Sequence, residues 1–518
     1  MRNSHHLRPC LIAGAVVALC GAGHAAAQSA PPATAATLDE VVVTAQRREE
    51  RLVDVPISVV TKSAEQLQAS GVRSMTDIAK LVPAVSVTRL GAYSQPAIRG
   101  VSTKANSPGL DANVATYVDG FYQSNPMAIN RSLADIENIQ VLRGPQGALY
   151  GRNATGGAFI ITTRTPTHTP TLNLSGEVER YSGHTINGFG SIGLTDNLAV
   201  SYTTHWGESD GWLRLIGPGA VNVPAAPRKT RNNRLRLLFE PTDKLNFLVT
   251  LEEGFNKDGT SLGFSYYAHP GTPGVSPLLT DPRNLTSYAN VPQIVSALWR
   301  GAYLTANADL GFATLTSYSQ YRKDRGIWRF DTDGSNVFTN VGSNARIRMP
   351  QRTMSQEFTL ASKGDGPLTW LAGASYLNDH TAQEFYFLTF IHPRIETKAL
   401  AAYADATYAV SDQLFLTVGG RYTQEKKHCS LGANSTGPYG DCPGGDPNRT
   451  DDGFTPRAVV RYEFDPNTSV YGSYTKGFKS GGYNTGSAAG QLRPEKISSF
   501  EVGAKTVRGP ISAEVAAF

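Results

Sequence analysis

The stretch LRLLFEPTDKLNFLVTLEE, residues 235–253, alternates apolar and polar residues on both sides of a short polar centre. Successive side chains of a strand point to opposite faces, so each half gathers its apolar residues on a single face. The centre, residues 241–244, combines Pro, Thr, Asp and Lys, which favour a turn. The stretch therefore predicts a tight antiparallel hairpin with one apolar face. That face is formed by Leu235, Leu237, Phe239, Leu245, Phe247, Val249 and Leu251.

The same pattern recurs downstream, with short turns at 364–366, 410–413 and 465–468. A soluble β-sandwich also alternates, but nothing in that fold confines long loops to every second connection. Short turns alternating with long polar loops are typical of an outer-membrane barrel. We therefore predict a transmembrane antiparallel β-barrel over residues 167–518. Its long loops are expected at 206–232, 254–300, 321–352, 378–399 and 424–455.

The N-terminus has the features of a cleaved secretion signal. Arg2 and Arg8 precede the apolar run of residues 11–23, and small residues follow at 25–27. The run is shorter than the roughly 20 residues of a membrane-spanning helix, and Leu19 disfavours lipid attachment at Cys20. We predict a signal peptide over residues 1–27. Without it, 46 basic residues face 43 acidic ones, a balance that gives no reason to expect nucleic acid as a partner.

Cys429 and Cys442 lie in one Gly-, Ser- and Pro-rich stretch, HCSLGANSTGPYGDCPGG. In an oxidising compartment two nearby cysteines on one loop are most simply a disulfide. A metal site with His428 is the alternative, and the stretch offers few other ligands. We predict the Cys429–Cys442 disulfide and no metal.

Residues 51–166 have a mixed α/β pattern. Ser63 and Gln66 match the two ends of a helix capping box, and Gly71 is placed to end that helix. A second helix is expected within 74–83, and Asp119–Gly120 predicts a hairpin turn. This unit would precede the barrel as a separate small domain.

Three motif-like strings suggest chemistry that their surroundings do not support. Residues 473–476, SYTK, match the S-x-x-K of acyl-serine enzymes but lie in a strand pattern rather than at a helix start. Residues 331–336, DTDGSN, resemble part of a calcium loop without its remaining ligands, so weak calcium binding stays open. Residues 144–157 are glycine-rich without a nucleotide-binding spacing. We predict no enzymatic activity and no cofactor.

Five stretches together resemble the TonB-dependent outer-membrane receptors. They are LDEVVVTAQRREE, AIRGVST, ATYVDGFY, DIENIQVLRGPQGALYGRNATGGAFIITTRTP and LRPEKISSFEVGAKT. The resemblance implies a plug domain, residues 51–166, inside a barrel that in the family has about 22 strands. Only Asn138 and Gln140 depart from the pattern, because the family often has charged residues there.

The resemblance also implies an energy-coupling segment, the TonB box, in the flexible N-terminal segment 28–50. Three consecutive valines in a polar region with no neighbour to pair with predict a strand that adds to a strand of TonB. The implied partners are TonB with ExbB and ExbD, outer-membrane lipid and a small-molecule or metal-chelate substrate. We expect a monomer. The box residues are Leu38, Asp39, Glu40, Val41, Val42, Val43, Thr44 and Ala45.

Within the plug, Arg99 and Arg143 resemble family arginines that face barrel glutamates, and Glu495 and Glu501 lie in the barrel motif that supplies them. Such charges are costly inside a barrel unless they are paired. Substrate is expected to contact plug loops that carry Tyr93, Phe121 and Tyr122.

The resemblance implies active transport of a scarce solute across the outer membrane of a Gram-negative bacterium, with a ferric siderophore as the first expectation. Carbohydrate, cobalamin or an aromatic compound are alternatives. A passive channel, or a surface-binding receptor remnant that does not transport, is the alternative from another class. Alternation places only about a dozen strands, so we expect the barrel to be partial in this chain.

Overall fold

A computed structural model describes residues 42–48, 50–72, 74–90, 93–102, 108–127, 135–216, 223–258, 280–281, 286–287, 294–331, 344–364, 366–387, 389–432, 435, 447–485, 491–508 and 511–518. These residues belong to one compact unit, Glu40–Phe518. The predicted signal peptide, residues 1–27, lies outside the described residues.

The N-terminal domain is built on a five-stranded mixed sheet in the order β3-β9-β10-β7-β8. The strand β10 pairs parallel with β7 and antiparallel with β9, so it lies at the centre of the sheet. Its residues Phe159 and Ile161 are buried in the plug core. The five strands are β3 (Val59–Ser63), β7 (Val114–Val118), β8 (Phe121–Tyr122), β9 (Ile136–Arg143) and β10 (Gly157–Thr163).

Short helices and a second small sheet complete this domain. The helix α1 (Ala64–Ala69) begins at Ser63, whose side chain accepts a hydrogen bond from the Gln66 amide, and the predicted capping box is present. Instead of a second α-helix within 74–83 there is a single 3₁₀ turn, η1 (Asp77–Lys80), just before Pro83. The second sheet contains β4 (Val85–Leu90), β5 (Tyr93–Ile98) and β6 (Val101–Ser102).

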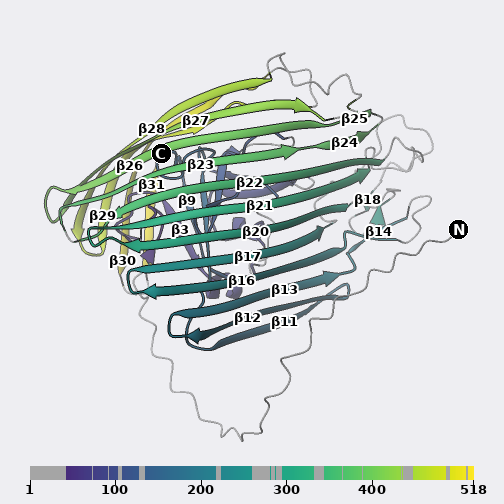
Figure 1. Ribbon diagram of the computed structural model, residues 1–518, viewed down its shortest axis with the longest axis horizontal. Helices are drawn as coiled ribbons and strands as arrows, with labels where there is room; N and C mark the ends of the chain where they lie inside the picture. The colour runs from purple at the N-terminus through teal and green to yellow at the C-terminus, as the bar shows by residue number, and fades with distance from the viewer. Residues whose placement is uncertain are drawn as a thin grey trace, which may run out of the picture. The chain divides into compact units, whose positions relative to one another are not determined.

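In the residues that the structure describes, the C-terminal domain is one antiparallel sheet of seventeen strands, joined largely in sequence order, and Figure 1 shows these strands side by side. A hairpin, β24 (Glu384–Phe387) and β25 (Thr389–Ile391), is inserted between β23 and β26. The remaining strands are β11 (Thr171–Glu179), β12 (Gly183–Thr195), β13 (Leu198–Ser209), β16 (Arg228–Thr242), β17 (Leu245–Asp258), β20 (Ile294–Asp309), β21 (Ala313–Asp331), β22 (Asn344–Ser362), β23 (Leu368–Ala382), β26 (Pro393–Ala409), β27 (Leu414–Leu431), β28 (Asn448–Asp465), β29 (Thr468–Lys479), β30 (Glu495–Arg508) and β31 (Ile511–Ala517).

The two faces of the large sheet differ in chemistry, as alternation along β27 illustrates. Arg421, Glu425 and Lys427 are buried on the face toward the plug, whereas Val418 and Tyr422 are exposed on the other face. The exposed face also carries Leu400, Phe454, Val460 and Phe500. An apolar outer face and a polar inner face match the pattern of outer-membrane barrels.

The predicted short turns are where the hairpins close. The strands β16 and β17 meet at Thr242–Leu245, and the other turns lie between β22 and β23, β26 and β27, and β28 and β29. The predicted long loops were too long, because the strands continue past the apolar band. For example, β21 extends to Asp331 although residues from 321 onward were assigned to a loop. Residues 322–326 of this strand, Arg-Lys-Asp-Arg-Gly, place no apolar side chain on either face, so apolar alternation gave no signal there.

The prediction of about a dozen strands was also too low. Glycine-rich β12, for instance, has few large apolar residues, so alternation does not reveal it. Within the part of the chain that the structure describes, β11 and β31 are the two edges of the sheet and are not paired with each other. In the same described residues, no helix is both long and apolar enough to cross a membrane.

Two further small sheets are separate from the plug sheets and from the seventeen-stranded sheet. A four-stranded sheet contains β14 (Leu213–Leu215), β15 (Val223–Ala225), β18 (Thr280–Asp281) and β19 (Thr286–Ser287). The other pairs β1 (Val42–Val43) with β2 (Glu50–Arg51) and lies in the segment assigned to energy coupling.

Candidate functional site

The C-terminal half of the predicted TonB-binding segment is an ordered part of the plug. Val42 pairs with Arg51 and Val43 with Glu50 in an antiparallel ladder. The expectation that this strand has no partner in its own neighbourhood was therefore wrong: the chain reverses at Ala45–Arg48 and supplies one. Leu38, Asp39, Glu40 and Val41 lie outside the described residues.

Side chains of the plug hold the segment in place. Val43 and Ala45 are buried in one plug core, at 1% and 0% exposure. The Thr44 amide donates to Gln140 Oε1 at 3.2 Å, and the Tyr150 hydroxyl donates to the Thr44 carbonyl at 3.3 Å. A strand-adding partner needs free backbone groups, so these residues must leave the plug before they can pair with another strand.

Arg47 fastens the same segment to the barrel wall. Its guanidinium Nη1 lies 3.1 Å from Glu357 Oε1 on β22. Its Cζ atom is 5.3 Å from the ring centroid of Tyr117, 5.0 Å from Tyr150 and 5.8 Å from Tyr403. A cation among aromatic faces and beside a carboxylate is stabilised by both contacts. Motif reasoning did not select Arg47, although its place two residues after the box is a usable signal.

Arg99 and Glu501 join the plug to the barrel. Arg99 Nη1 lies 2.5 Å from Glu501 Oε2, and both side chains are almost fully buried. The other carboxylate oxygen accepts the Tyr471 hydroxyl at 2.7 Å and the Ser58 amide at 3.2 Å. The Arg99 guanidinium also lies 3.8 Å from the Phe518 ring centroid. Every oxygen of this buried carboxylate therefore has a donor.

Arg143 pairs with Glu514 rather than with either predicted glutamate. The Nη2–Oε1 distance is 2.7 Å, and the Ser58 hydroxyl donates to the same carboxylate. Lys505 Nζ is 3.8 Å from the other oxygen. Glu514 faces the plug because it lies opposite Lys505 in the β30–β31 ladder.

Glu495 has a different role from the one that the motif suggested. It pairs with Lys479 of the neighbouring strand at 2.7 Å and accepts from the Asn113 amide of the plug at 3.1 Å. Its side chain is 53% exposed. Glu495 therefore makes a polar plug–barrel contact, but its ion pair lies within the barrel. It is the first residue of β30, whereas Glu501, which pairs with Arg99, lies six residues further along the strand.

A second buried network, which sequence reasoning missed, joins the plug to β27. Asp111 lies 2.9 Å from Arg152 and 2.6 Å from Lys427, and Glu425 lies 2.8 Å from Arg152. Burial by itself would raise the pKa of Asp111, but the cations Arg152 and Lys427 outweigh it and hold that pKa well below its usual value. Asp111 is therefore a carboxylate at neutral pH.

Asp135 of the plug and Arg234 of the barrel form a further plug–barrel ion pair. Arg234 also lies 2.7 Å from Glu252, which in turn lies 3.0 Å from Arg322. All four side chains are almost completely buried. No local pattern could have paired residues so far apart in the sequence, although arginines at strand positions facing the interior are a general signal.

The three aromatic residues expected to meet substrate lie at the interface of plug and barrel. Tyr93 is buried with Met127, Val295, Ile347 and Met349. Phe121 is buried with its ring centroid 4.9 Å from Tyr303 and 5.6 Å from Tyr318. The Tyr122 hydroxyl accepts a hydrogen bond from Asn153 at 2.8 Å.

The cavity beside Tyr93 is small. It encloses about 50 Å³ between the plug and β22, β23, β26 and β27, and it is bordered by Asp111, Arg152 and Asp379. That volume holds a water molecule or two, so a larger ligand could enter only after the surrounding plug segments move. Substrate loops were expected near residues 91–93, 103–110 and 121–127, and of these residues 91–92 and 103–107 lie outside the described residues.

Comparison with known families identifies both domains. Residues 51–158 match the TonB-dependent Receptor Plug Domain, and residues 245–518 match the model described as TonB dependent receptor-like, beta-barrel. The chain belongs to the TonB-dependent receptor family. Members of this family are transport receptors rather than enzymes.

Curated relatives of this TonB-dependent receptor include the pesticin receptor of Yersinia pestis, 24% identical over 501 residues, or 92% of this chain and 70% of the relative. The vitamin B12 transporter BtuB of Vibrio vulnificus is 32% identical over 133 residues, or 24% of this chain and 21% of the relative. The fold is similar to that of the ferric yersiniabactin uptake receptor FyuA from Yersinia pestis, with a TM-score of 0.73, 20% identity, and coverage of 89% and 71% of the two chains. The Pseudomonas aeruginosa receptor bound to ferripyoverdine gives a TM-score of 0.75 at 15% identity, with coverage of 93% and 66%.

The remaining predicted features of this TonB-dependent receptor fall partly outside the described residues. Cys429 is buried and disulfide-bonded, whereas Cys442 lies outside the described residues, so their pairing stays a prediction. Residues 332–336 of the calcium-like string are also outside them, and the described residues contain no group of three or more His, Cys, Asp or Glu placed to hold a metal ion. Ser473 and Lys476 lie within β29, not at a helix start.

Proposed function

We propose that this chain acts in TonB-dependent active transport across the outer membrane of a Gram-negative bacterium. The observation that supports this best is the state of the energy-coupling segment. Residues Val42–Arg47 are held by a two-residue ladder, a few side-chain hydrogen bonds and the Arg47–Glu357 ion pair. Such contacts can be exchanged for backbone hydrogen bonds to an added TonB strand, whereas a segment integrated into the central plug sheet could not leave without unfolding it.

The same segment is connected to the part of the plug that must move. Gln140, which bonds Thr44, lies on β9, and Arg143 at the end of that strand pairs with Glu514 of the barrel. Force applied to residues 38–45 would therefore reach a strand that is bonded directly to the barrel wall. In this proposal TonB, with ExbB and ExbD, supplies the force, and the receptor works as a monomer.

For the substrate we propose a ferric siderophore. Support comes from similarity in fold to receptors whose names specify ferric yersiniabactin and ferripyoverdine. Tyr93, Phe121 and Tyr122 are proposed to meet the substrate once the plug has shifted, since all three border small cavities between plug and barrel. Carbohydrate, cobalamin and aromatic compounds are the alternatives for a substrate screen.

The experiment is to compare Val42→Pro with Val42→Ala in the full chain. Proline removes the backbone donor that an added strand needs, whereas alanine only shortens the side chain. We expect Val42→Pro to lose capture by the purified periplasmic domain of TonB and energised uptake of ferric siderophores, with surface binding of the same compounds retained. Val42→Ala should keep both activities.

Unchanged uptake in Val42→Pro would contradict energised transport and favour a passive channel. Surface binding without uptake in both the unmodified chain and Val42→Ala would favour a receptor that does not transport. A panel of iron chelates, cobalamin, oligosaccharides and aromatic acids, tested on the unmodified chain, addresses the substrate separately.

A further inference from the structure

The side chain of Arg47 occupies a cage of aromatic rings where the plug meets the barrel. Its Cζ atom lies 5.3 Å from the ring centroid of Tyr117, 5.0 Å from Tyr150 and 5.8 Å from Tyr403. Its Nη1 atom lies 3.1 Å from Oε1 of Glu357. We call Tyr117, Tyr150, Tyr403 and Glu357 the tyrosine cage. Ring faces and a carboxylate around one cation are the elements of a cation-binding site.

The cage is held together by contacts of its own. The Tyr117 hydroxyl donates to the Tyr150 carbonyl at 2.6 Å, and the Tyr403 hydroxyl donates to Glu357 Oε1 at 2.6 Å. The Tyr403 ring also lies against the backbone at Gly373, where an added Cβ would overlap it. All three rings are buried. Since these contacts are made without Arg47, the shape of the cage does not depend on that side chain.

Arg47 is an imperfect occupant of the cage. Among the described residues, its buried Nε and Nη2 atoms meet no acceptor in hydrogen-bond geometry. A buried donor without an acceptor costs free energy. A cation with fewer N–H groups avoids that cost, because ring faces attract the charge itself rather than its donors. The cage is therefore better matched to an alkylated ammonium group than to a guanidinium.

The charge balance of the cage depends on Arg47. Within the described part of the chain, Arg47 is the one cation that forms an ion pair with Glu357. Arg152 and Arg421, which border the adjoining cavity, are held by other polar side chains of plug and barrel. Once Arg47 leaves, Glu357 is a buried carboxylate without its counter-ion, a state that is costly until another cation enters.

The adjoining cavity connects the cage to a residue proposed to meet substrate. It encloses about 50 Å³ and is bordered by Tyr117, Tyr150 and Glu357 of the cage and by Tyr122. The ring centroids of Tyr117 and Tyr122 are 5.5 Å apart. Departure of the Arg47 side chain would enlarge this cavity by the space that it vacates. A molecule in contact with Tyr122 is therefore one ring away from the cage.

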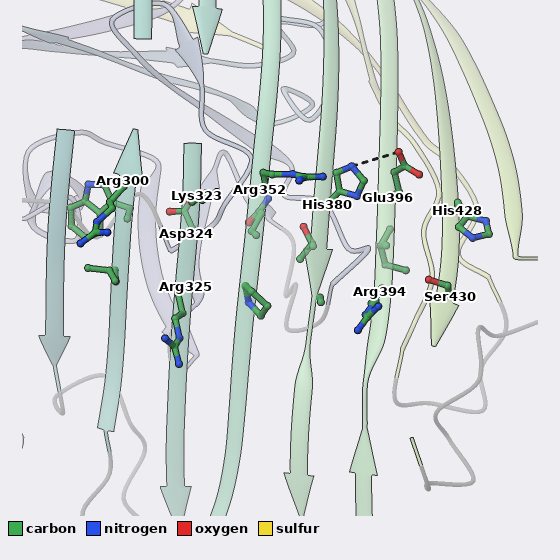
Figure 2. A pocket seen from close by; sticks show the side chains of 17 residues that line it. Arg300, Lys323, Asp324, Arg325, Arg352, His380, Arg394, Glu396, His428 and Ser430 are labelled. Atoms are coloured by element: carbon green, nitrogen blue, oxygen red, sulfur yellow. Dashed lines mark ion pairs between the residues drawn. The ribbon is translucent and has the colours of Figure 1, made fainter. Parts of the chain in front are cut away.

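A larger hollow elsewhere on the large sheet has no such enclosure. It has a volume of about 590 Å³ and is bordered by exposed cations such as Lys323 and Arg352. Figure 2 shows its charged side chains spread over neighbouring strands, with the contact between His380 and Glu396 among them. Trp299 is the single Phe, Tyr or Trp among the described residues that line it. Convergent rings, rather than volume, distinguish the tyrosine cage.

We propose that the tyrosine cage binds an alkylated ammonium group of the transported molecule once the energy-coupling segment has withdrawn Arg47. In the resting receptor Arg47 fills the site as an internal cation. The inference rests on the proposed function, because withdrawal of residues 42–47 is the step that opens the cage. It names one chemical feature of the substrate, and a ferric siderophore fits it when the siderophore carries such a group.

The test uses the purified full chain in detergent, with tetramethylammonium as the probe and tert-butanol as a neutral compound of similar size. Arg47→Ala vacates the cage without any partner protein. The matched control Arg143→Ala removes a plug arginine from another barrel carboxylate, Glu514, outside the cage. Glu357→Gln, Tyr403→Leu and Tyr403→Phe are each added to Arg47→Ala. Isothermal titration calorimetry at constant ionic strength measures binding, and circular dichroism checks folding.

We expect Arg47→Ala to bind tetramethylammonium at least about tenfold more tightly than the unmodified chain, since ring faces and a desolvated carboxylate both favour a cation. Added Glu357→Gln or Tyr403→Leu should abolish that gain. Added Tyr403→Phe should keep it, because the ring remains. Neither Arg143→Ala nor the neutral compound should show the gain.

Equal binding of the probe by Arg47→Ala and the unmodified chain would overturn the proposal. Equal binding of tert-butanol would show an apolar void rather than a cation site. The same gain in Arg143→Ala would show that any unpaired carboxylate in the interior suffices, which also contradicts a role for the rings.

A second measurement links the cage to energy coupling. The unmodified chain, saturated with the purified periplasmic domain of TonB, should bind tetramethylammonium as Arg47→Ala does. Binding by Arg47→Ala alone would mean that Arg47 stays in the cage during coupling, which overturns the role in transport. Failure to capture TonB, by contrast, contradicts the proposed function, and the cation site is then judged on Arg47→Ala.

Discussion

Arg99 of the plug and Glu501 of the barrel form an ion pair of 2.5 Å that is shielded from water on both sides. Removing one partner of such a pair leaves the other charge buried and uncompensated, which costs about 3–5 kcal/mol. We therefore expect Glu501→Gln to lower the thermal unfolding midpoint in detergent and to expose the plug to protease.

Glu495→Gln provides the matched control for that prediction. Glu495 lies on the same strand but is 53% exposed, its ion pair is with Lys479 of the barrel, and its contact with the plug is a single hydrogen bond from the Asn113 side chain. Exposed pairs contribute at most about 1 kcal/mol, so the midpoint should hardly move. An equal fall in both variants would show that the Arg99–Glu501 pair does not fasten the plug.

The contacts of Arg47 are expected to control how readily the energy-coupling segment leaves the plug. Arg47→Ala removes the ion pair with Glu357 and the contacts with three tyrosine rings. We expect faster amide hydrogen exchange at residues 43–46, because the ladder of β1 and β2 alone is too short to hold the segment. Arg47→Lys should stay closer to the unmodified chain, since it keeps the charge.

Exchange at residues 59–63 of β3 supplies an internal reference. That strand belongs to the main plug sheet and should be equally protected in both variants. If residues 43–46 exchange at the same rate with and without Arg47, the contacts with β22 and β26 do not restrain the segment.

The lowered pKa of Asp111 gives the stability of the folded protein a pH dependence with a defined sign. Its pKa lies below the usual 3.8 because Arg152 and Lys427 favour the carboxylate over the burial that opposes it. A depressed acid pKa contributes stability that is fully present above the unfolded-state value and is lost as pH falls through the folded-state value. Thermal midpoints should therefore fall as the pH is lowered below about 4, and less steeply in Asp111→Asn than in the unmodified chain.

Asp196→Asn, at an exposed turn, tests the specificity of that result. It should leave the slope of midpoint against pH unchanged. Asp111→Asn should also be less stable at pH 7, since two buried cations lose a charged partner. Identical slopes in all three proteins would mean that Asp111 does not titrate differently in the folded state.

Local signals in the sequence predicted local structure well. The capping box at Ser63 and Gln66 and the turns at 241–244 and 410–413 depend on neighbouring residues alone, and the fold has them there. Where the apolar band ends, as at Lys323 and Arg325 on β21, the strand continues with polar residues on its outer face. Pairing with neighbouring strands, rather than side-chain pattern, determines the structure there.

Most partners distant in the sequence could not be predicted, the Arg99–Glu501 pair apart. Arg143 was selected by motif. Its partner Glu514 reaches it because of the register of β31 on β30 and the way the plug lies against these strands. The same holds for Arg47 with Glu357 and for Asp135 with Arg234. These charges are buried only where plug and barrel meet, so their burial, and with it the cost of losing a partner, cannot be inferred from either stretch of sequence alone.

A substitution at Gly120 tests how closely the plug hairpin approaches the barrel. It follows Asp119 in the β7–β8 turn with φ of +85°, and a Cβ added there would come within 2.5 Å of the Tyr318 ring on β21. Gly120→Ala should therefore destabilise the protein by about 1–3 kcal/mol through strain and overpacking, seen as a lower thermal midpoint. Gly472→Ala on β29, where an added Cβ meets no atom within 4 Å, should leave the midpoint nearly unchanged. If the two glycines tolerate alanine equally, the contact of the hairpin with Tyr318 is looser than the structure has it, and the plug would be free to shift at this point without disturbing the wall.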